Sequence, residues 1–258
     1  MAFKIDRYKM LIRNFSNWPE FLLSKIHKPD SFIFKRRDGF VVEVPKTFQS
    51  VFKENFFDQS YWRGFPDTIS KNEPLDILDI GGNVGYFGLF AMSSFPNAKV
   101  YSFEPIPYNF REMESCKKQY GFENWHLYHQ AVSDSLEPLT LYASRKDGFC
   151  LMASTASSGL LQHQFEIKST TLKSIFDETK LDKFDLVKID CEGSEYHILY
   201  SWTEFEFDRI DRLVIETHPN MDKPGFNHHD LLKYLETYGW KLNSTIEREG
   251  TGYIWAWK

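Results

Sequence analysis

The sequence predicts an α/β protein: a doubly wound, Rossmann-like sheet of mostly parallel strands, preceded by a small N-terminal extension. Two observations lead to this prediction. From residue 75 onward, short apolar strands alternate with helical stretches, an alternation typical of a parallel sheet with right-handed crossovers. The first of these strands also enters its helix through a glycine-rich turn. Ligands bind beyond the carboxyl ends of the strands in such folds, so functional residues are expected there.

Each element has a local reason. The apolar residues 75–80 form the first strand, and the glycine turn 81–85 leads into a helix over 86–95. Pro107 suits the first position of the next helix, and Thr171 suits the N-cap of a later one. The remaining elements are expected, in chain order, as strands at 98–103 and 126–132, short strands at 139–143 and 164–167, a helix at 172–179, a strand at 184–190, a helix from 194, a strand at 212–216, a helix at 229–238 and an antiparallel pair at 240–244 and 252–257.

Residues 1–72 mix short apolar stretches with charges and with turn signals at 28–30 and 37–39. This pattern predicts helices and a small hairpin rather than a second full domain. We therefore divide the chain into an extension, 1–72, and a main domain, 73–258. The extension is also where we expect any homo-oligomer to form. The long polar segment 144–162 is expected to be a mobile loop that closes over the acceptor, with simple disorder as the alternative.

Composition argues against several classes of partner. A net charge of -5 and a pI near 5.9 give no general reason to bind nucleic acid or an anionic membrane. The N-terminus is too charged for a secretory signal, and no run of about 18 apolar residues occurs. Cys116, Cys150 and Cys191 are widely spaced and follow no disulfide or zinc pattern. We therefore expect a cytoplasmic protein whose partner is a small molecule or a carbohydrate.

The turn after the first strand indicates the cofactor. A dinucleotide-binding GxGxxG motif fails here in both registers, and the Gly-Lys pair of a phosphate-binding loop is absent. What remains is an acid, Asp79, followed by Gly81, Gly82 and Gly85. An acid at this place favours a cationic ligand, and the sulfonium of S-adenosylmethionine has that character. Glu104 ends the second strand, where a carboxylate can accept hydrogen bonds from ribose hydroxyls.

Four segments, taken in order, resemble the motifs of the FkbM-type methyltransferases: 78–87, 103–105, 130–134 and 187–195. The first alone would indicate only a class I methyltransferase, whereas the IDxEGxE signature in the last is more specific. The resemblance spans residues 73–218 and implies a seven-stranded sheet with an antiparallel C-terminal strand and S-adenosylmethionine as cofactor. It further implies O-methylation of a sugar, a nucleotide-activated sugar, a polysaccharide or a related natural product.

The resemblance also assigns individual residues to parts of the cofactor. Those around its methionine end would be Asp79, Gly81, Gly82, Asn83 and Gly85. Glu104 would hold the ribose, and the residues bordering the adenine would be Gln130, Ala131 and Val132. Asp190 would lie beside the transferred methyl group. Glu192 would shape the turn there or act in catalysis, with complementation of a helix dipole as the alternative for Glu192 and Glu195.

An alcohol acceptor needs a group that removes its proton. Asp190 ends the fourth strand, and Glu216 and His218 end the fifth, so the three are expected to converge on one patch. His218 is predicted as the general base because imidazole titrates near neutrality. Alternatively, Asp190, Glu216 and His218 hold Mg²⁺ or Mn²⁺. Two other functions remain open: a noncatalytic S-adenosylmethionine-binding protein, and methyl transfer to nitrogen or to a nucleic acid.

Overall fold

The computed structural model describes residues 2–66, 69–143, 153–154, 163–218, 223–247 and 250–258. The segment predicted to act as a lid, 144–162, therefore lies outside the described residues except for Ala153 and Ser154. The chain forms two compact units, Met1–Arg63 and Gly64–Lys258. Within the described parts of the chain, no helix combines the length and the apolar character that crossing a membrane requires.

The first unit is built around aromatic side chains. Its elements are α1 (Ala2–Asn14), α2 (Trp18–His27), the antiparallel hairpin of β1 (Ser31–Lys35) and β2 (Val41–Pro45), η1 (Lys46–Phe48), α3 (Gln49–Lys53) and η2 (Glu54–Asp58). Phe34 of β1 is fully buried, and its ring centroid lies 4.6 Å from that of Phe52. Phe15 from the end of α1 meets both Phe34 and Phe57 edge to face, so the cluster joins helix, hairpin and final turns.

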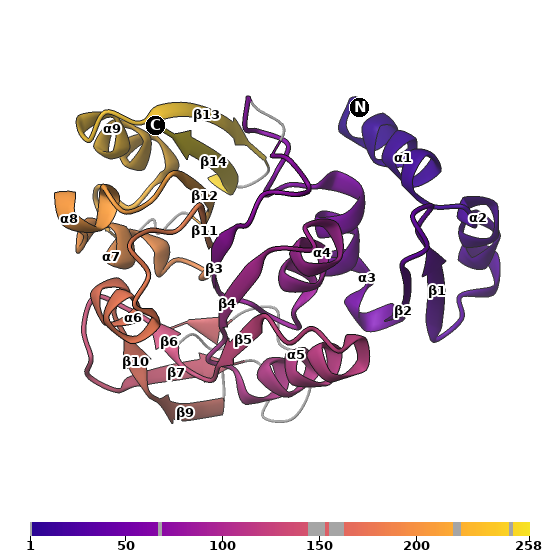
Figure 1. The fold of residues 1–258 in the computed structure, drawn as a ribbon, viewed down its shortest axis with the longest axis horizontal. Coiled ribbons are helices and arrows are strands. Elements are labelled where there is room, and N and C mark those ends of the chain that lie inside the picture. The colour runs from indigo at the N-terminus through magenta and orange to yellow at the C-terminus, as the bar shows by residue number, and fades with distance from the viewer. Residues whose placement is uncertain (1, 67–68, 144–152, 155–162, 219–222, 248–249) are drawn as a thin grey trace. The chain divides into compact units, whose positions relative to one another are not determined.

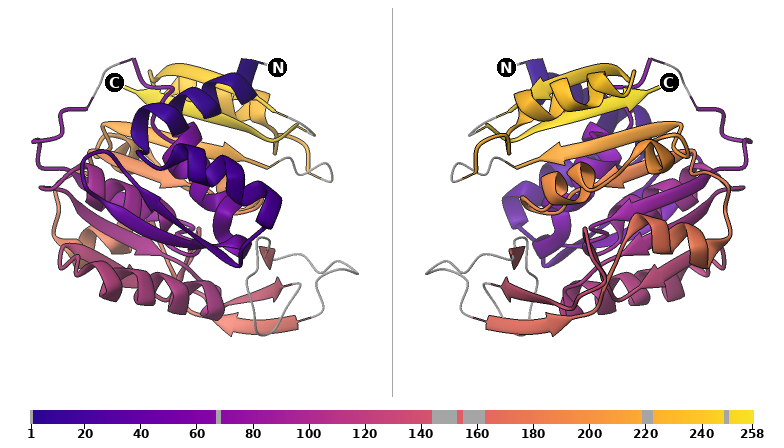
Figure 2. Two further views of the ribbon diagram at one scale, coloured as in Figure 1. Left: turned by 90° about the vertical axis from the view of Figure 1, so that its right-hand side faces the viewer. Right: turned by 90° about the vertical axis from the view of Figure 1, so that its left-hand side faces the viewer.

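The second unit contains the predicted seven-stranded sheet. Its strands are β3 (Asp76–Ile80), β4 (Lys99–Phe103), β5 (Trp125–Tyr128), β11 (Leu186–Ile189), β12 (Arg212–Thr217), β13 (Lys241–Ile246) and β14 (Gly252–Trp257). They are ordered β13-β14-β12-β11-β3-β4-β5. The pairs from β12 to β5 are parallel, and β14 is antiparallel to both its neighbours. The predicted α/β fold class is confirmed. Figure 2 shows the progressive twist of the strands.

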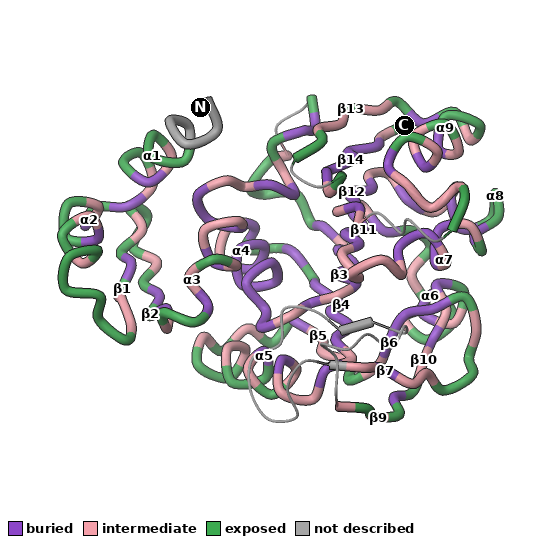
Figure 3. The backbone as a smooth tube through the Cα atoms, turned by 180° about the vertical axis from the view of Figure 1, so that it is seen from behind, coloured by how far each residue is buried: buried purple, intermediate pink, exposed green. Residues whose placement is uncertain are grey.

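Helices cover both faces of this sheet (Figure 1). On one face lie α4 (Tyr86–Ser94) and α5 (Pro107–Tyr120), and on the other α6 (Leu172–Thr179), α7 (Glu195–Tyr200), α8 (Glu204–Phe207) and α9 (His228–Thr237). As expected, Pro107 opens α5, and the Thr171 hydroxyl caps α6 by accepting a hydrogen bond from the Ser174 amide at 3.2 Å. The central strands are buried along almost their whole length (Figure 3).

The prediction of one strand over 126–132 is wrong in its second half. β5 ends at Tyr128, and residues 131–132 form β6 (Ala131–Val132), which pairs with β10 (Ser169–Thr170) in a separate two-stranded sheet. The cause lies in the neighbouring strand. β4 ends at Phe103, the Glu104 amide donates a last backbone hydrogen bond to the Tyr128 carbonyl at 3.1 Å, and the next residue, Pro105, has no N–H to donate.

A three-stranded antiparallel sheet lies near the β5 edge (Figure 1). It consists of β7 (Leu139–Ala143), β8 (Ala153–Ser154) and β9 (His163–Ile167). β7 and β9 are the two short strands expected from the sequence, and Leu139 pairs with Ile167. This small sheet brings apolar side chains to the carboxyl ends of the central strands, where ligands bind in this kind of fold.

Candidate active site

The glycine turn after β3 is held against its two neighbouring strands. The amides of Gly81 and Gly82 both donate to the Phe103 carbonyl, at 3.0 and 2.9 Å. Gly81 has φ +81°, and a Cβ there would lie 1.8 Å from the Asp190 carbonyl oxygen at the end of β11. Any side chain at this position would therefore both strain the turn and push β3 and β11 apart.

Glu104, the residue after β4, is almost completely buried, with 4 % of its surface exposed. One carboxylate oxygen accepts a hydrogen bond from the Ile106 amide and the other from the Asn83 amide, both at 2.7 Å. Burial raises the pKa of Glu104 to about 7, although the two backbone donors act in the opposite direction. Because a carboxylate has about four lone-pair sites, each oxygen can accept a further hydrogen bond from a ligand.

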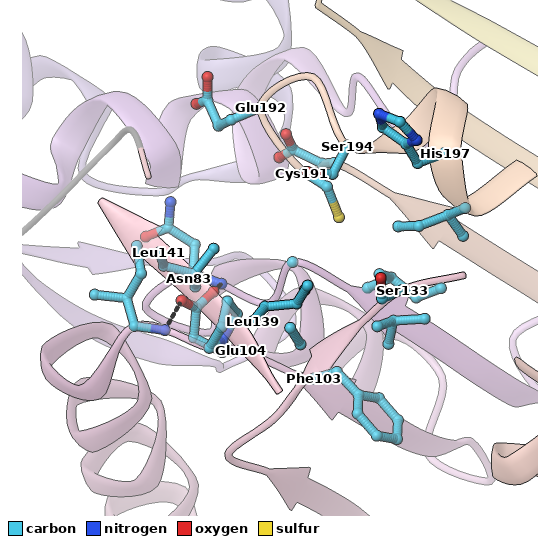
Figure 4. Close-up of a pocket in the computed structure, with 18 of the residues that line it drawn as sticks. Asn83, Phe103, Glu104, Ser133, Leu139, Leu141, Cys191, Glu192, Ser194 and His197 are labelled. Atoms are coloured by element: carbon cyan, nitrogen blue, oxygen red, sulfur yellow. Dashed lines mark hydrogen bonds between the residues drawn. The ribbon is translucent and has the colours of Figure 1, made fainter. Parts of the chain in front are cut away.

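Glu104 lines a cavity of about 290 Å³ at the carboxyl ends of the strands. The side chains around it form two groups in Figure 4: Asn83 and Glu104 on one side, and Cys191, Glu192, Ser194 and His197 on the other. The cavity also has apolar lining residues, namely Ile80, Phe103, Pro105, Ile106, Ala131, Val132, Leu139, Leu141 and Ile198. A mixed lining of this kind suits a ligand with one polar end and one flat apolar part.

Two residues of this lining adopt an unusual backbone conformation. The non-glycine residues with positive φ in the described chain are Lys28, Gln59, Asn83, Lys180 and Glu192. Three of them are C-caps of helices, where the left-handed conformation is ordinary. The other two, Asn83 and Glu192, are not helix C-caps, and both line the cavity. Such strain concentrates at functional sites because the surrounding structure has to maintain it.

Glu195 connects the turn after β11 to the end of β12. Its side chain is fully buried, and one carboxylate oxygen accepts a hydrogen bond from the Gly193 amide at 2.8 Å. The other oxygen accepts one from the His218 backbone amide and lies 3.4 Å from His218 Nδ1. Glu195 therefore holds the turn that carries Glu192, rather than facing the cavity itself.

His218 lies among carboxylates. Besides Glu195, its ring is 3.8 Å from Glu192 and 3.9 Å from Glu216, both measured from Nε2. Burial lowers the pKa of His218, but the Glu195 carboxylate, together with the charges of Asp190 and Glu192, outweighs this effect and raises the pKa to about 10. At neutral pH the ring is an imidazolium, which has no lone pair to accept a proton.

The structure brings together about half of the residues predicted for the site. Those that line the cavity are Gly81, Asn83, Glu104, Ala131, Val132, Asp190 and Glu192. Those that lie outside its lining are Asp79, Gly82, Gly85, Gln130, Glu216 and His218. In the part of the chain that the structure describes, no three His, Cys, Asp or Glu side chains are disposed to hold a metal ion. Asp190, Glu216 and His218 thus share one edge of the sheet without forming a ligand set.

Several residues of the site were not predicted from the sequence. Ile106, Leu139 and Leu141 supply apolar walls, and their role depends on a small sheet that no local pattern places. Lys188 was also missed, although a signal was present: a lysine in the middle of the apolar run 184–190. A central strand is buried on both faces, so a lysine there needs a buried counter-charge.

Comparisons with known proteins indicate the family of this chain. The model of the methyltransferase FkbM domain matches residues 79–242. Methyltransferase 1 of Beauveria bassiana is 25 % identical over 213 residues, covering 76 % of this chain and 82 % of that protein. The 31-O-demethyl-FK506 methyltransferase FkbM of Streptomyces tacrolimicus is 25 % identical over 201 residues, covering 66 % of this chain and 74 % of that protein.

Among solved structures, the FkbM methyltransferase of Methylobacillus flagellatus superposes with a TM-score of 0.52 at 12 % identity, over 81 % of this chain and 53 % of that one. This likeness supports the fold. The family match covers more than half of the chain and includes the glycine turn, Glu104 and the turn after β11. The chain therefore belongs to the FkbM family of class I, S-adenosylmethionine-dependent methyltransferases.

Proposed function

We propose that this methyltransferase transfers a methyl group from S-adenosylmethionine to a hydroxyl oxygen of a natural product, a sugar or a related carbohydrate. The observation that carries the proposal is the pairing of two carboxyl groups, Glu104 and Asp190, with an apolar wall around one cavity. The carboxylates complement a cationic ligand with ribose hydroxyls, and the apolar wall complements a purine ring.

The lining residues fit the cofactor part by part. Glu104 would accept hydrogen bonds from the ribose, while Ile106, Ala131 and Val132 would border the adenine. The glycine turn and Asp190 would surround the methionine end. When bound, the sulfonium supplies an electrophilic methyl group. The protein's own task is then to align the acceptor oxygen and exclude water, which can contribute a large part of the rate enhancement.

We propose that Asp190 is the general base that removes the acceptor proton, and that Glu192 is the second carboxylate available for this role. Both line the cavity, whereas His218 is protonated at neutral pH and lies outside the lining. His218 would instead act as a cation that holds Glu192 and Glu195 in place. This assignment replaces the predicted base with a carboxylate on the adjacent strand. Glu216 would contribute to the same charge cluster around His218.

Two observations support the proposed class of acceptor: the name of one relative and the acidic composition of the second unit. The Streptomyces tacrolimicus relative is named 31-O-demethyl-FK506 methyltransferase, and a substrate name that marks a missing O-methyl group favours oxygen over nitrogen. Residues 64–258 contain 29 Asp and Glu but 19 Lys and Arg. This acidic balance disfavours a nucleic acid. The extension at 1–72 would serve as an appendage and as a contact for homo-oligomers, which size-exclusion chromatography of the full chain would test.

Mass spectrometry of the purified protein with S-adenosylmethionine and a panel of sugars, nucleotide-activated sugars, glycans and macrolide-like alcohols tests the proposal. We expect one acceptor to gain a methylene equivalent on oxygen, with and without EDTA. Methylation only at nitrogen would contradict the oxygen assignment. Loss of activity with EDTA and its recovery with Mg²⁺ or Mn²⁺ would contradict the metal-free mechanism. The matched control is Asp190→Asn, which should bind the cofactor without transferring the methyl group.

A further inference from the structure

Lys188 is a buried lysine in the middle of the central strand β11, with 2 % of its surface exposed. Its ammonium lies 3.3 Å from Asp79 Oδ1 and 3.5 Å from Asp190 Oδ2. It also donates a hydrogen bond to the Gly81 carbonyl at 2.5 Å. Burial lowers the pKa of Lys188, but the charges of Asp79 and Asp190 outweigh burial and raise it, so the ammonium is charged at neutral pH.

The contacts of Lys188 continue across the sheet. Asp79 of β3 pairs with Lys188 on one side and with Ser102 of β4 on the other. The Ser102 hydroxyl donates to Asp79 Oδ2 at 2.8 Å and accepts from the Trp125 indole of β5 at 2.9 Å. A buried polar chain thus runs through four adjacent strands and ends at Asp190, on the lining of the cavity. Lys188 is its last member before that lining.

We propose that Lys188 is a positioning residue that sets the two opposite parts of the cofactor cavity in one arrangement. It contacts the glycine turn through the Gly81 carbonyl and the turn after β11 through the Asp190 carboxylate. An ammonium has three donors and no acceptor, so it can hold several oxygen atoms together at once. The proposal rests on the proposed function, because it assigns Lys188 a role in binding S-adenosylmethionine.

A simpler role for Lys188 is that of a counter-ion for Asp79. A buried ion pair can often be replaced by neutral side chains without loss of stability, whereas removal of one partner leaves a costly unpaired charge. The two roles therefore predict different behaviour for one variant. If Lys188 only neutralises Asp79, then Lys188→Met with Asp79→Asn should recover both stability and cofactor binding. If Lys188 positions the cavity, the same double variant should recover stability alone.

The experiment compares Lys188→Met, Asp79→Asn and the double variant by thermal melting and by calorimetric titration with S-adenosylmethionine, below the lowest Tm. We expect both single variants to melt lower than the wild type and the double variant to melt close to it. Cofactor Kd should rise at least ten-fold in Lys188→Met and in the double variant, and less in Asp79→Asn. Asp185→Ala is the matched control, because it removes the hydrogen bond from the Asp76 amide at the other end of β3 and β11. It should lower Tm without changing Kd.

Two results would overturn the proposal. One is a wild-type affinity for S-adenosylmethionine in the double variant, and the other is a loss of that affinity in Asp79→Asn as large as in the double variant. If the double variant does not fold, Lys188→Leu with Asp79→Asn takes its place, because it likewise leaves no hydrogen-bond donor at position 188, and the same outcomes apply. Failure of the wild-type protein to bind S-adenosylmethionine would instead refute the proposed function, so the two failures are distinguishable.

Discussion

Glu104 should make cofactor affinity depend on pH near neutrality. With a pKa of about 7, about a tenth of this carboxyl group is ionised at pH 6 and about nine tenths at pH 8. A cationic ligand in the same cavity favours the ionised form. The affinity for S-adenosylmethionine should therefore rise by up to about ten-fold from pH 6 to pH 8.

The raised pKa of Glu104 also makes the free energy of unfolding fall as the pH rises. A carboxyl group whose pKa is raised from 4.5 to about 7 stabilises the fold fully below about pH 4.5, and this contribution is lost as the pH rises through 7. At 1.36 kcal/mol for each pKa unit, the loss is about 3 kcal/mol. Urea unfolding at pH 5 and pH 8 should show most of this decrease for the wild type and a smaller one for Glu104→Gln.

The binding assay is calorimetric titration at pH 6, 7 and 8. Glu104→Gln should bind more weakly at pH 8 and lose the pH dependence, which controls for titration of the ligand's own groups. S-adenosylhomocysteine, which lacks the sulfonium charge, should show a weaker dependence with the wild type. Equal affinities of the wild type at pH 6 and pH 8, or an unchanged dependence in the variant, would refute the assignment of Glu104 to the cofactor site.

Three further predictions concern other residues of the second unit. His218→Ala should lower the free energy of unfolding at pH 7 by about 2 kcal/mol, because buried Glu195 loses its cation; since the pKa of His218 is about 10, urea unfolding should show this difference disappearing as the pH rises through 10. Asp190→Asn should reduce methyl transfer at least about 100-fold, a much larger factor than the accompanying loss of cofactor affinity; near-normal turnover on the acceptor found by mass spectrometry would exclude Asp190 as the base. Gly88→Ala should lower Tm, although alanine favours helices, because its Cβ would lie 2.4 Å from the Trp125 ring and overpacking costs about 1–3 kcal/mol; an unchanged Tm would show that the ring can move.

The parts of the fold that local patterns predict well are those with a local cause. The apolar strand 76–80, the glycine turn and the helix from Tyr86 were expected because strand, turn and helix follow one another directly. The break after Tyr128 was not expected, because it depends on where β4 ends. Residues 131–132 then pair with residues 169–170, and no pattern near either segment indicates that partner.

The candidate site shows the same division. Glu104 and Asp190 were predicted because each follows a strand whose end belongs to the ligand crevice, and both line the cavity. The protonation of His218 was not predictable, since it depends on how deeply Glu195 is buried and on the distance between two strand ends. Lys188 could have been predicted from the sequence. A charged side chain inside an apolar strand needs a partner of opposite charge on a neighbouring strand, and Asp79 was already predicted as a site residue.

Trp125 has a consequence for how this family can diverge. Its indole fills the space beside two glycines: a Cβ at Gly85 would lie 2.9 Å from the ring, and a Cβ at Gly88 would lie 2.4 Å from it. Three positions separated by about forty residues along the chain thus share one volume, and none can enlarge alone. We expect them to evolve together. A homologue that carries a side chain where this chain has Gly88 should have a smaller residue in place of Trp125, and it should then lack the indole that donates to Ser102.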